Sequence, residues 1–308
     1  MQMHANSESA PNKPSWKVWW ELTRPHTLTA SFVPVLIGTA LALHYGKIHI
    51  PLFLSMMAAC LLIQAATNMF NEYYDYKRGI DTEHSVGIGG AIVREGVAPK
   101  TVLAIAFSLY GLAMLLGIYI CGETSWWLCL IGLIGMAVGY LYTGGPYPIS
   151  ATPFGEIFAG FFMGMLFILI SFYIQTGEVT MLSVLISLPI TLLVGAILLS
   201  NSIRDIDEDT LGGRKTLAIL VGKKNAIYVL ASMFIMAYAI ITVLVIMQLV
   251  SPWLLLVYLS IALPIKSIKI FSAGQTPKEM APAMGATAKT NTIFGFLQAL
   301  GLLISYFI

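Results

Sequence analysis

Long apolar stretches dominate this sequence, and short polar segments separate them. A helix needs about 20 mainly apolar residues to cross the hydrocarbon core of a bilayer. Because each stretch has about this length, we expect an all-α, polytopic membrane bundle. We count nine transmembrane helices, predicted at 27–45, 51–72, 101–120, 126–142, 154–175, 181–201, 225–249, 252–271 and 290–308.

The composition supports a membrane protein. The chain is 57% hydrophobic and only 10% charged, whereas a soluble domain has about 25% charged residues. The net charge of +2 gives no indication of a nucleic-acid partner. The three cysteines, Cys60, Cys121 and Cys129, lie in or beside apolar runs without metal-ligand spacing. We interpret them as small core residues.

Basic residues indicate the orientation of the bundle. With the N-terminus in the cytoplasm, sixteen of the 17 Lys and Arg residues lie inside and only Lys47 lies outside. Cytoplasmic connections are enriched in such residues. We therefore expect a multi-pass protein of the plasma (inner) membrane with its C-terminus outside. Residues 1–26 predict a cytoplasmic arm with an interfacial, tryptophan-rich helix, and 27–308 predict one domain in which helices one to four are repeated by helices five to eight.

Two polar motifs follow apolar runs at matching positions. Asn71 and Asp75 close the second predicted span, and Asn201, Asp205 and Asp209 follow the sixth. If the sixth helix continues, its three polar residues lie on one face at a spacing of four. Like charges so arranged need a cation, and magnesium binds carboxylates together with substrate phosphates. Two such clusters facing each other predict a diphosphate–metal site.

At this point the sequence resembles a known family. The two motifs, together with Arg24-Pro25 and the segment from Lys289 to Leu303, resemble the UbiA superfamily of intramembrane aromatic prenyltransferases. Further phrases are similar to its menaquinone branch, whose acceptor is 1,4-dihydroxy-2-naphthoate. These are the stretches 75–81, 204–209, 213–217 and 142–148, the last leading to Gly155-Glu156.

The resemblance implies a fold and a reaction. The fold would be a nine-helix bundle in the lipid bilayer, with a lipid-accessible central cavity and a cytoplasmic polar cap. The reaction would depend on Mg²⁺. A polyprenyl diphosphate would lose its diphosphate to give an allylic cation, the naphthoate ring would attack that cation, and carbon dioxide would leave.

Site residues follow from the motifs and this chemistry. Metal ions and basic side chains neutralise a leaving diphosphate, and aromatic faces stabilise a cation. The expected metal ligands are Asn71, Asp75, Asp81, Asp205 and Asp209, although Asp81 follows Gly79 past the helix end at an unusual spacing. The expected substrate-binding residues are Arg24, Asn71, Arg78, Asn201, Lys215 and Tyr147. The expected catalytic residues are Asp75, Asp205, Asp209 and Tyr142.

Other interpretations stay open from the sequence. The basic residues also suit topology anchors, and the two tyrosines suit packing or an interfacial belt. Glu156 is either a buried functional acid or a charge that stabilises a helix N-terminus. Segment 87–90 is a flexible turn or a cover for the diphosphate. A transporter places its acids near the bilayer midplane, unlike this chain, and a scaffold needs no metal clusters. Another acceptor, such as 4-hydroxybenzoate, is the main alternative within the family.

Overall fold

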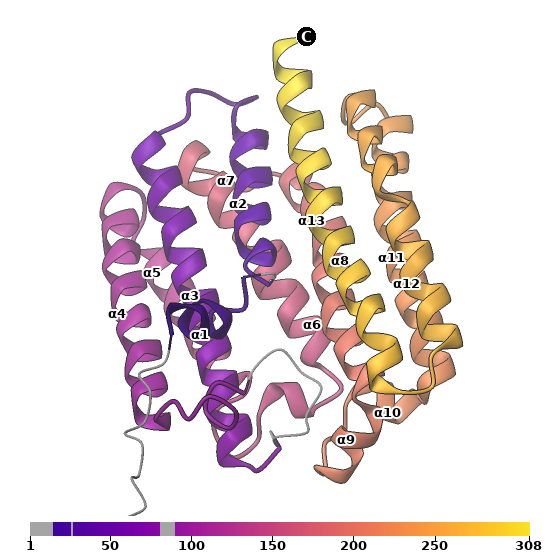
Figure 1. Ribbon diagram of the computed structural model, residues 1–308. Coiled ribbons are helices and arrows are strands. Elements are labelled where there is room, and N and C mark those ends of the chain that lie inside the picture. The colour runs from indigo at the N-terminus through magenta and orange to yellow at the C-terminus, as the bar shows by residue number, and fades with distance from the viewer. Residues whose placement is uncertain (1–14, 26, 81–89) are drawn as a thin grey trace, which may run out of the picture.

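A computed structural model describes residues 15–25, 27–80 and 90–308 of the chain. These residues form helices and their connections, with no strand in the described ranges (Figure 1). The all-α prediction is therefore confirmed. The helices of the first half are α1 Trp16–Leu22, α2 Thr29–Ala42, α3 Ile50–Lys77, α4 Pro99–Glu123 and α5 Trp127–Leu141. They continue with the short η1 Ile149–Ala151, α6 Gly155–Ala159, the π-helical η2 Gly160–Leu166 and α7 Phe167–Thr176.

The second half of the chain is also helical. Its helices are α8 Met181–Arg204, α9 Ile206–Leu211, α10 Leu217–Val221, α11 Lys223–Ile246, the 3₁₀-helical η3 Pro252–Ser260, α12 Ala262–Ala273 and α13 Pro277–Phe307.

Seven helical segments in the described residues are long and apolar enough to cross a membrane. They are α3, α4, α6–η2–α7, α8, α11, η3–α12 and α13. The other two predicted spans coincide with shorter apolar helices, α2 with 14 residues and α5 with 15. The structure thus confirms a multi-helix apolar bundle, and the count of nine spans stays a prediction.

The last helix begins earlier than the sequence predicts. We expected a span over 290–308, whereas α13 starts at Pro277. Pro277 suits the first helical position, because a backbone N–H there would have no partner within the helix and proline has none to leave unpaired. The Thr276 side chain accepts a hydrogen bond from the Glu279 N–H at 3.3 Å and so caps the helix. Lys278, Glu279 and Lys289 interrupt the apolar pattern, which is why counting apolar residues missed these first turns.

One large core holds the second half of the bundle to α2. Buried side chains of α2, α8, α11, α12 and α13 form it, including Ile37, Ile190, Phe271 and Phe294. A second cluster joins α1, α3 and α4, and a third joins the opposite end of α3 to α5 and α7. The arm helix α1 packs through Val18 and Leu22, while Trp16 is 80% exposed. The domain boundary at residue 26 and the internal repeat stay predictions.

Two glycines allow very close packing of the π-helical segment on α8. A Cβ on Gly160 would lie 2.5 Å from the Thr191 carbonyl oxygen, and one on Gly164 would lie 2.6 Å from Thr191 Cα. Small residues four apart let helix backbones approach in a membrane. This contact fixes the start of α6 beside the end of α8.

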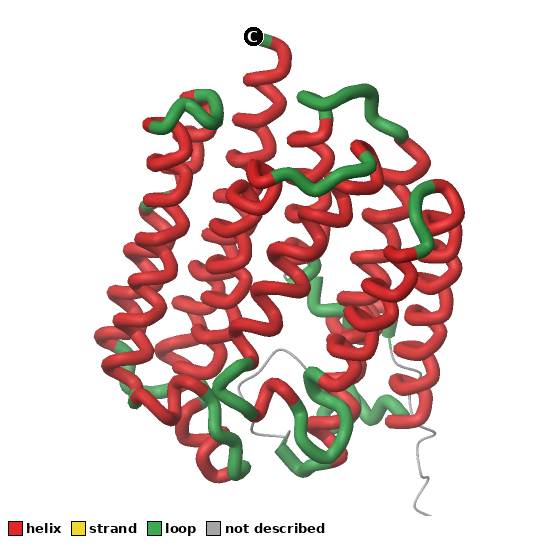
Figure 2. The backbone as a smooth tube through the Cα atoms, turned by 180° about the vertical axis from the view of Figure 1, so that it is seen from behind, coloured by secondary structure: helices red, strands yellow, loops and turns green. Residues whose placement is uncertain are grey.

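Both polar motifs lie at the same end of the bundle. In Figure 1 the short helices α9 and α10 lie at the bottom, where α3 and α8 also end, and the C-terminus lies at the top. The view from behind shows the same arrangement, with several loops gathered at the lower end (Figure 2). Residues far apart in the sequence therefore share one end of the molecule.

Candidate active site

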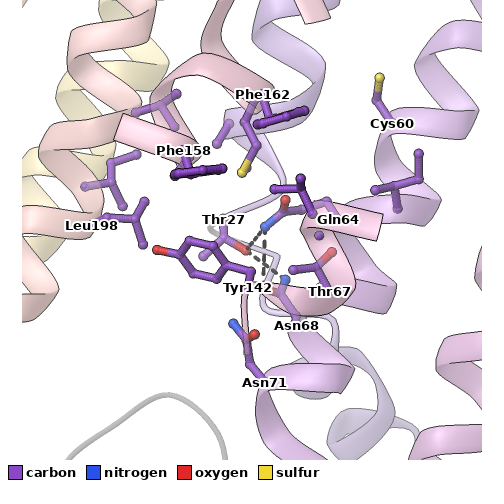
Figure 3. A pocket seen from close by; sticks show the side chains of 18 of the residues that line it. Thr27, Cys60, Gln64, Thr67, Asn68, Asn71, Tyr142, Phe158, Phe162 and Leu198 are labelled. Atoms are coloured by element: carbon purple, nitrogen blue, oxygen red, sulfur yellow. Dashed lines mark hydrogen bonds between the residues drawn. The ribbon is translucent and has the colours of Figure 1, made fainter. Parts of the chain in front are cut away.

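A cavity of about 910 Å³ opens into the bundle from this end. The elements that line it are α2, α3, α4, α5, η1, α6, η2, α7, α8, α9 and α13. Its inner part is apolar, with Phe158, Phe162, Leu198 and Cys60 among the side chains drawn in Figure 3. The acids and bases of the two motifs line its outer part. The cavity therefore has an apolar interior and a charged mouth.

Helix α3 presents a polar face to the cavity. Gln64, Asn68, Asn71 and Asp75 follow one another at helical spacing and all line it. Asn68 Nδ2 donates to Thr27 Oγ1 at 2.9 Å and to the Thr23 carbonyl at 2.8 Å, which ties α3 to the segment before α2. Gln64 Nε2 lies 3.5 Å from Thr27 Oγ1 (Figure 3). Asn71 and Asp75 occupy the last turns of this face, nearest the mouth.

The second motif spans a break between two helices. Helix α8 ends at Arg204 and α9 begins at Ile206, so the continuous helix considered from the sequence is interrupted at Asp205. The Asp205 N–H still donates to the Asn201 carbonyl at 3.0 Å, and the Asp209 N–H to the Asp205 carbonyl at 2.8 Å. Because this four-residue spacing survives the break, all three residues line the cavity.

Arg214 joins the two motifs. One guanidinium nitrogen donates to Asp75 Oδ1 and another to Asp209 Oδ1, each at 2.9 Å. Burial raises the pKa of Asp209 to about 6, although Arg214 opposes this shift. Burial also lowers the pKa of Arg214, but the nearby carboxylates of Asp75, Asp209 and Asp205 together raise it by more. Arg214 thus carries the charge that keeps two carboxylates from different helices close together.

Two further acids at this end, Asp205 and Glu72, have partners of their own. Arg204 donates to both carboxylate oxygens of Asp205, at 2.5 and 2.6 Å. Glu72 is 1% exposed, and its Oε1 accepts from the backbone N–H groups of Gly90 and Ile92 at 2.7 and 3.2 Å. Arg24, which lines the cavity, lies 3.7 Å from Glu72 Oε2. Glu72 therefore fixes both Arg24 and the segment that returns to the cavity at Gly90.

The structure brings most of the predicted site residues together. Arg24, Asn71, Asp75, Tyr142, Asn201, Asp205 and Asp209 all line the cavity. Figure 3 shows the Tyr142 ring between Leu198 and the group of Thr27, Gln64 and Asn68.

Three predicted substrate-binding residues do not line the cavity. Arg78 instead donates to the Gly145 carbonyl at 2.9 Å and lies over the Tyr74 ring, which ties α3 to the 142–154 connection. Lys215 is exposed, and its backbone N–H bonds to Ala151. Tyr147 is 89% exposed. Arg78 is thus held by contacts outside the cavity, and the side chains of Lys215 and Tyr147 extend into solvent or the membrane interface. Asp81 lies outside the described residues, as does segment 87–89.

Sequence reasoning missed several residues of the site. The sequence predicts Lys215 as a substrate-binding residue, whereas its neighbour Arg214 enters only with the basic residues that indicate topology and as part of the stretch 213–217. Gln64 and Asn68 were absorbed into an apolar run. A signal for these two existed, because polar side chains inside a membrane span are costly and are usually functional. Nothing in the local sequence distinguishes Arg214 from Lys215.

The donor chemistry of the mouth fits a hard divalent cation. Carboxylate and amide oxygens suit Mg²⁺, and Asn71 Oδ1 has no hydrogen-bond partner among the described residues. Over those same residues, however, no three His, Cys, Asp or Glu side chains are grouped closely enough to hold a metal ion. Arg214 lies between Asp75 and Asp209 instead. A metal that used both carboxylates would require Arg214 to move.

Comparison with known proteins decides the family. A sequence profile described as the UbiA prenyltransferase family matches residues 31–306. The chain belongs to this family. It is 60% identical over 301 residues to the 1,4-dihydroxy-2-naphthoate octaprenyltransferase of Bacillus subtilis (strain 168), covering 97% of each chain.

Solved UbiA-family structures share the fold. The apo structure of a UbiA homologue from Aeropyrum pernix K1 has a TM-score of 0.68 at 16% identity, covering 91% of this chain and 97% of the other. A UbiA homologue from Archaeoglobus fulgidus bound to GPP and Mg²⁺ has a TM-score of 0.61 at 16% identity, covering 91% and 99%. The UbiA fold of this chain thus extends over almost its whole length.

Proposed function

We propose that this protein transfers a polyprenyl group from polyprenyl diphosphate to 1,4-dihydroxy-2-naphthoate. Diphosphate and carbon dioxide leave, and the product is demethylmenaquinol, an intermediate of menaquinone biosynthesis. One observation carries the proposal: two polar motifs from separate helices meet at the mouth of a long apolar cavity. The 60% identity to an enzyme named for this acceptor supports its identity.

The two parts of the cavity divide the prenyl diphosphate between them. Its chain is apolar and suits the interior lined by Phe158, Phe162 and Leu198. Its diphosphate suits the mouth, where Arg24 and Arg214 provide cationic nitrogens. Asn201 lines the same cavity, and its amide can donate a hydrogen bond to a phosphate oxygen. Tyr142 faces the junction of the two parts, where the positive charge of the allylic carbon develops.

We propose Mg²⁺ as the metal, held by Asp75, Asp205, Asp209 and Asn71. When bound, it neutralises charge on the departing diphosphate. The Mg²⁺-bound neighbour of the same fold supports this choice. The chain's own residues have three tasks: they bind the diphosphate, exclude water from the allylic carbon and hold the acceptor ring against it.

The proposed topology has nine spans, with the N-terminus and the polar cap in the cytoplasm and the C-terminus outside. Sixteen of the 17 basic residues support it through their sequence positions. The C-terminus lies at the end of the bundle opposite α9 and α10 (Figure 1), which agrees with an odd number of spans. The clustering of the acids at one end also disfavours a transporter, whose acids lie near the midplane.

An acceptor panel tests this function. Purified full-length protein is given a polyprenyl diphosphate and Mg²⁺, with 1,4-dihydroxy-2-naphthoate or 4-hydroxybenzoate as acceptor. Mass spectrometry should show a prenylated naphthalene product that has lost its carboxyl group, with diphosphate and carbon dioxide released. Little 4-hydroxybenzoate should be consumed. Equal or better use of 4-hydroxybenzoate with its carboxylate retained would assign the protein to another branch of the family.

A further inference from the structure

Glu156 is a buried acid whose environment differs from that of the other buried acids. Three acidic side chains in the described residues are buried: Glu72, Glu156 and Asp209. Glu72 lies near Arg24, and Asp209 is paired with Arg214. Glu156 is 6% exposed and has no cationic partner within the described part of the chain. Burying a carboxylate without a partner is costly, so this position calls for an explanation.

The two oxygens of this carboxylate are not equivalent. Oε1 accepts a hydrogen bond from Ser202 Oγ at 3.3 Å, which connects α6 to α8. Oε2 has no hydrogen-bond partner among the described residues. Glu156 lies in the first turn of α6, where its charge also stabilises the helix N-terminus, but that role gives Oε2 no hydrogen-bond partner. One oxygen is thus held in place, and the other is left for a donor that the chain does not supply.

The position of Glu156 in the cavity indicates what that donor is. Glu156 and Ser202 both line the cavity. Ser202 lies one turn of α8 before Asp205, on the inner side of the charged mouth, and Phe158 begins the apolar wall two residues after Glu156. This junction is where the first carbon of a prenyl diphosphate must lie, because that carbon joins the diphosphate to the apolar chain. The acceptor ring has to reach the same carbon.

We infer that Glu156 binds a hydroxyl group of the aromatic acceptor and so orients the attacked ring carbon toward the prenyl group. This inference rests on the proposed function. A hydroxyl group donates to a carboxylate in a strong, charge-assisted bond. The Tyr142 hydroxyl lies close to Gly155, as a Cβ built on Gly155 would be 3.4 Å from it. Tyr142 therefore forms the adjoining wall of the same subsite.

The test pairs a change in the enzyme with a change in the acceptor. Purified full-length wild type and Glu156→Gln are assayed with Mg²⁺ and a polyprenyl diphosphate. The acceptors are 1,4-dihydroxy-2-naphthoate and its two monomethyl ethers, each of which lacks one hydroxyl donor. In wild type, the ether that removes the Glu156 contact should lose about tenfold or more in kcat/KM. In Glu156→Gln that discrimination should fall to about twofold or less, because an amide can donate to an ether oxygen.

Controls separate binding from structure. Ser202→Ala removes the donor to Oε1 but keeps the carboxylate, so discrimination between the hydroxyl and the ether should persist. Glu156→Asp keeps the charge on a shorter side chain. It should raise the acceptor KM while preserving some discrimination, and it provides a second test if Glu156→Gln does not fold. KM for the prenyl diphosphate and the half-saturating Mg²⁺ concentration should stay within about twofold of wild type in both Glu156 variants.

Two results would overturn the inference. One is wild-type discrimination between hydroxyl and ether in Glu156→Gln. The other is a loss of prenyl diphosphate or Mg²⁺ binding in Glu156→Gln that is as large as its loss of acceptor discrimination. That result would place Glu156 in the diphosphate site. Failure of the proposed function looks different, because wild type itself would then not prenylate the naphthoate.

Discussion

At the scale of single residues, the charged mouth is a set of carboxylates held by arginines. From the motifs alone, the acids are expected to repel one another, so that removing one relieves strain. The structure changes this expectation for Asp75 and Asp209, because Arg214 is bonded to both. Removing either acid costs an ion pair, and removing Arg214 costs two. The arginine is therefore the residue on which the electrostatics of the mouth depend most.

Replacing Arg214 should have opposite effects on stability and on metal binding. Arg214→Gln leaves two largely buried carboxylates without a cation, which should lower the free energy of unfolding by roughly 1–3 kcal/mol. The same change frees both carboxylates for a divalent ion. Mg²⁺ alone should therefore raise the thermal midpoint more in the variant than in wild type. Prenyl diphosphate affinity should fall, because a phosphate-binding cation is lost.

The neighbouring lysine provides the matched control for Arg214. Lys215→Gln removes the same charge from an exposed side chain outside the cavity. Its stability, Mg²⁺ response and prenyl diphosphate KM should all match wild type. Equal responses of the two variants would show that net charge, rather than the Asp75–Arg214–Asp209 contact, is responsible.

Asp209 predicts how the metal requirement varies with pH. Burial raises its pKa to about 6, so its carboxylate is ionised at neutral pH and takes up a proton as the pH falls through 6. Below that value a metal has to displace this proton. The half-saturating Mg²⁺ concentration should be flat above about pH 7 and should rise up to about tenfold per unit below pH 6. Activity titrated with Mg²⁺ from pH 5 to 8 measures this, and a flat dependence over that range would contradict it.

At the scale of helices, the apolar pattern predicts that a helix exists better than it predicts the residues at which that helix begins and ends. The predicted span 181–201 matches α8 at its start, because Thr180 caps a run that is clearly apolar. The start of α13 was missed because its first turns are polar. The break at Asp205 was also not visible. The Arg204–Asp205 and Arg214–Asp209 contacts beside it are local, whereas Arg214 also bonds to Asp75 of α3, 139 residues away. Local sequence contains no record of that last contact.

The contact between η2 and α8 offers a prediction at this scale. Gly164→Ala places a methyl group 2.6 Å from Thr191 Cα, which the packed backbones cannot accommodate without moving apart. We expect a loss of roughly 1–3 kcal/mol in the free energy of unfolding. Because α6 would shift with η2, acceptor KM should also rise.

Another helical glycine is a suitable control for this substitution. Gly111 lies on α4, and a Cβ built there meets nothing within 4 Å. Gly111→Ala should be neutral or slightly stabilising, since alanine favours helix over glycine. Denaturation in detergent compares both variants with wild type. Equal effects of the two substitutions would mean that helix propensity, rather than the close approach to α8, determines the outcome.

At the scale of the whole molecule, polar function is confined to one end. The short helices α9 and α10 lie there (Figure 1), and the motif residues with their arginine partners line the cavity that opens at that end. The composition and the motifs were sufficient to predict this segregation. The depth and shape of the cavity were not predictable, because they depend on how side chains from helices far apart in the sequence pack around one space.

The bundle orientation is tested by reporter fusions. A reporter placed after Ile308 and one inserted at 212–213 should report opposite sides of the membrane, with the second in the cytoplasm. Residues 212–213 connect α9 to α10 and are exposed, so an insertion there is tolerated more readily than one in a helix. The same side for both reporters would show that the number of spans between residue 213 and the C-terminus is even, which contradicts the three expected there.

The cavity wall formed by α4 and α5 is also part of the outer surface of the bundle. Met114, Ile118 and Leu133 line the cavity and are each more than 40% exposed. The interior is therefore continuous with the hydrocarbon phase of the membrane along this wall. A long-chain substrate then arrives by lateral diffusion in two dimensions, without passing through water. For such an enzyme the relevant concentration of the prenyl diphosphate is its mole fraction among the lipids. Adding inert lipid while the total amount of prenyl diphosphate stays constant should therefore slow turnover, just as dilution slows a soluble enzyme.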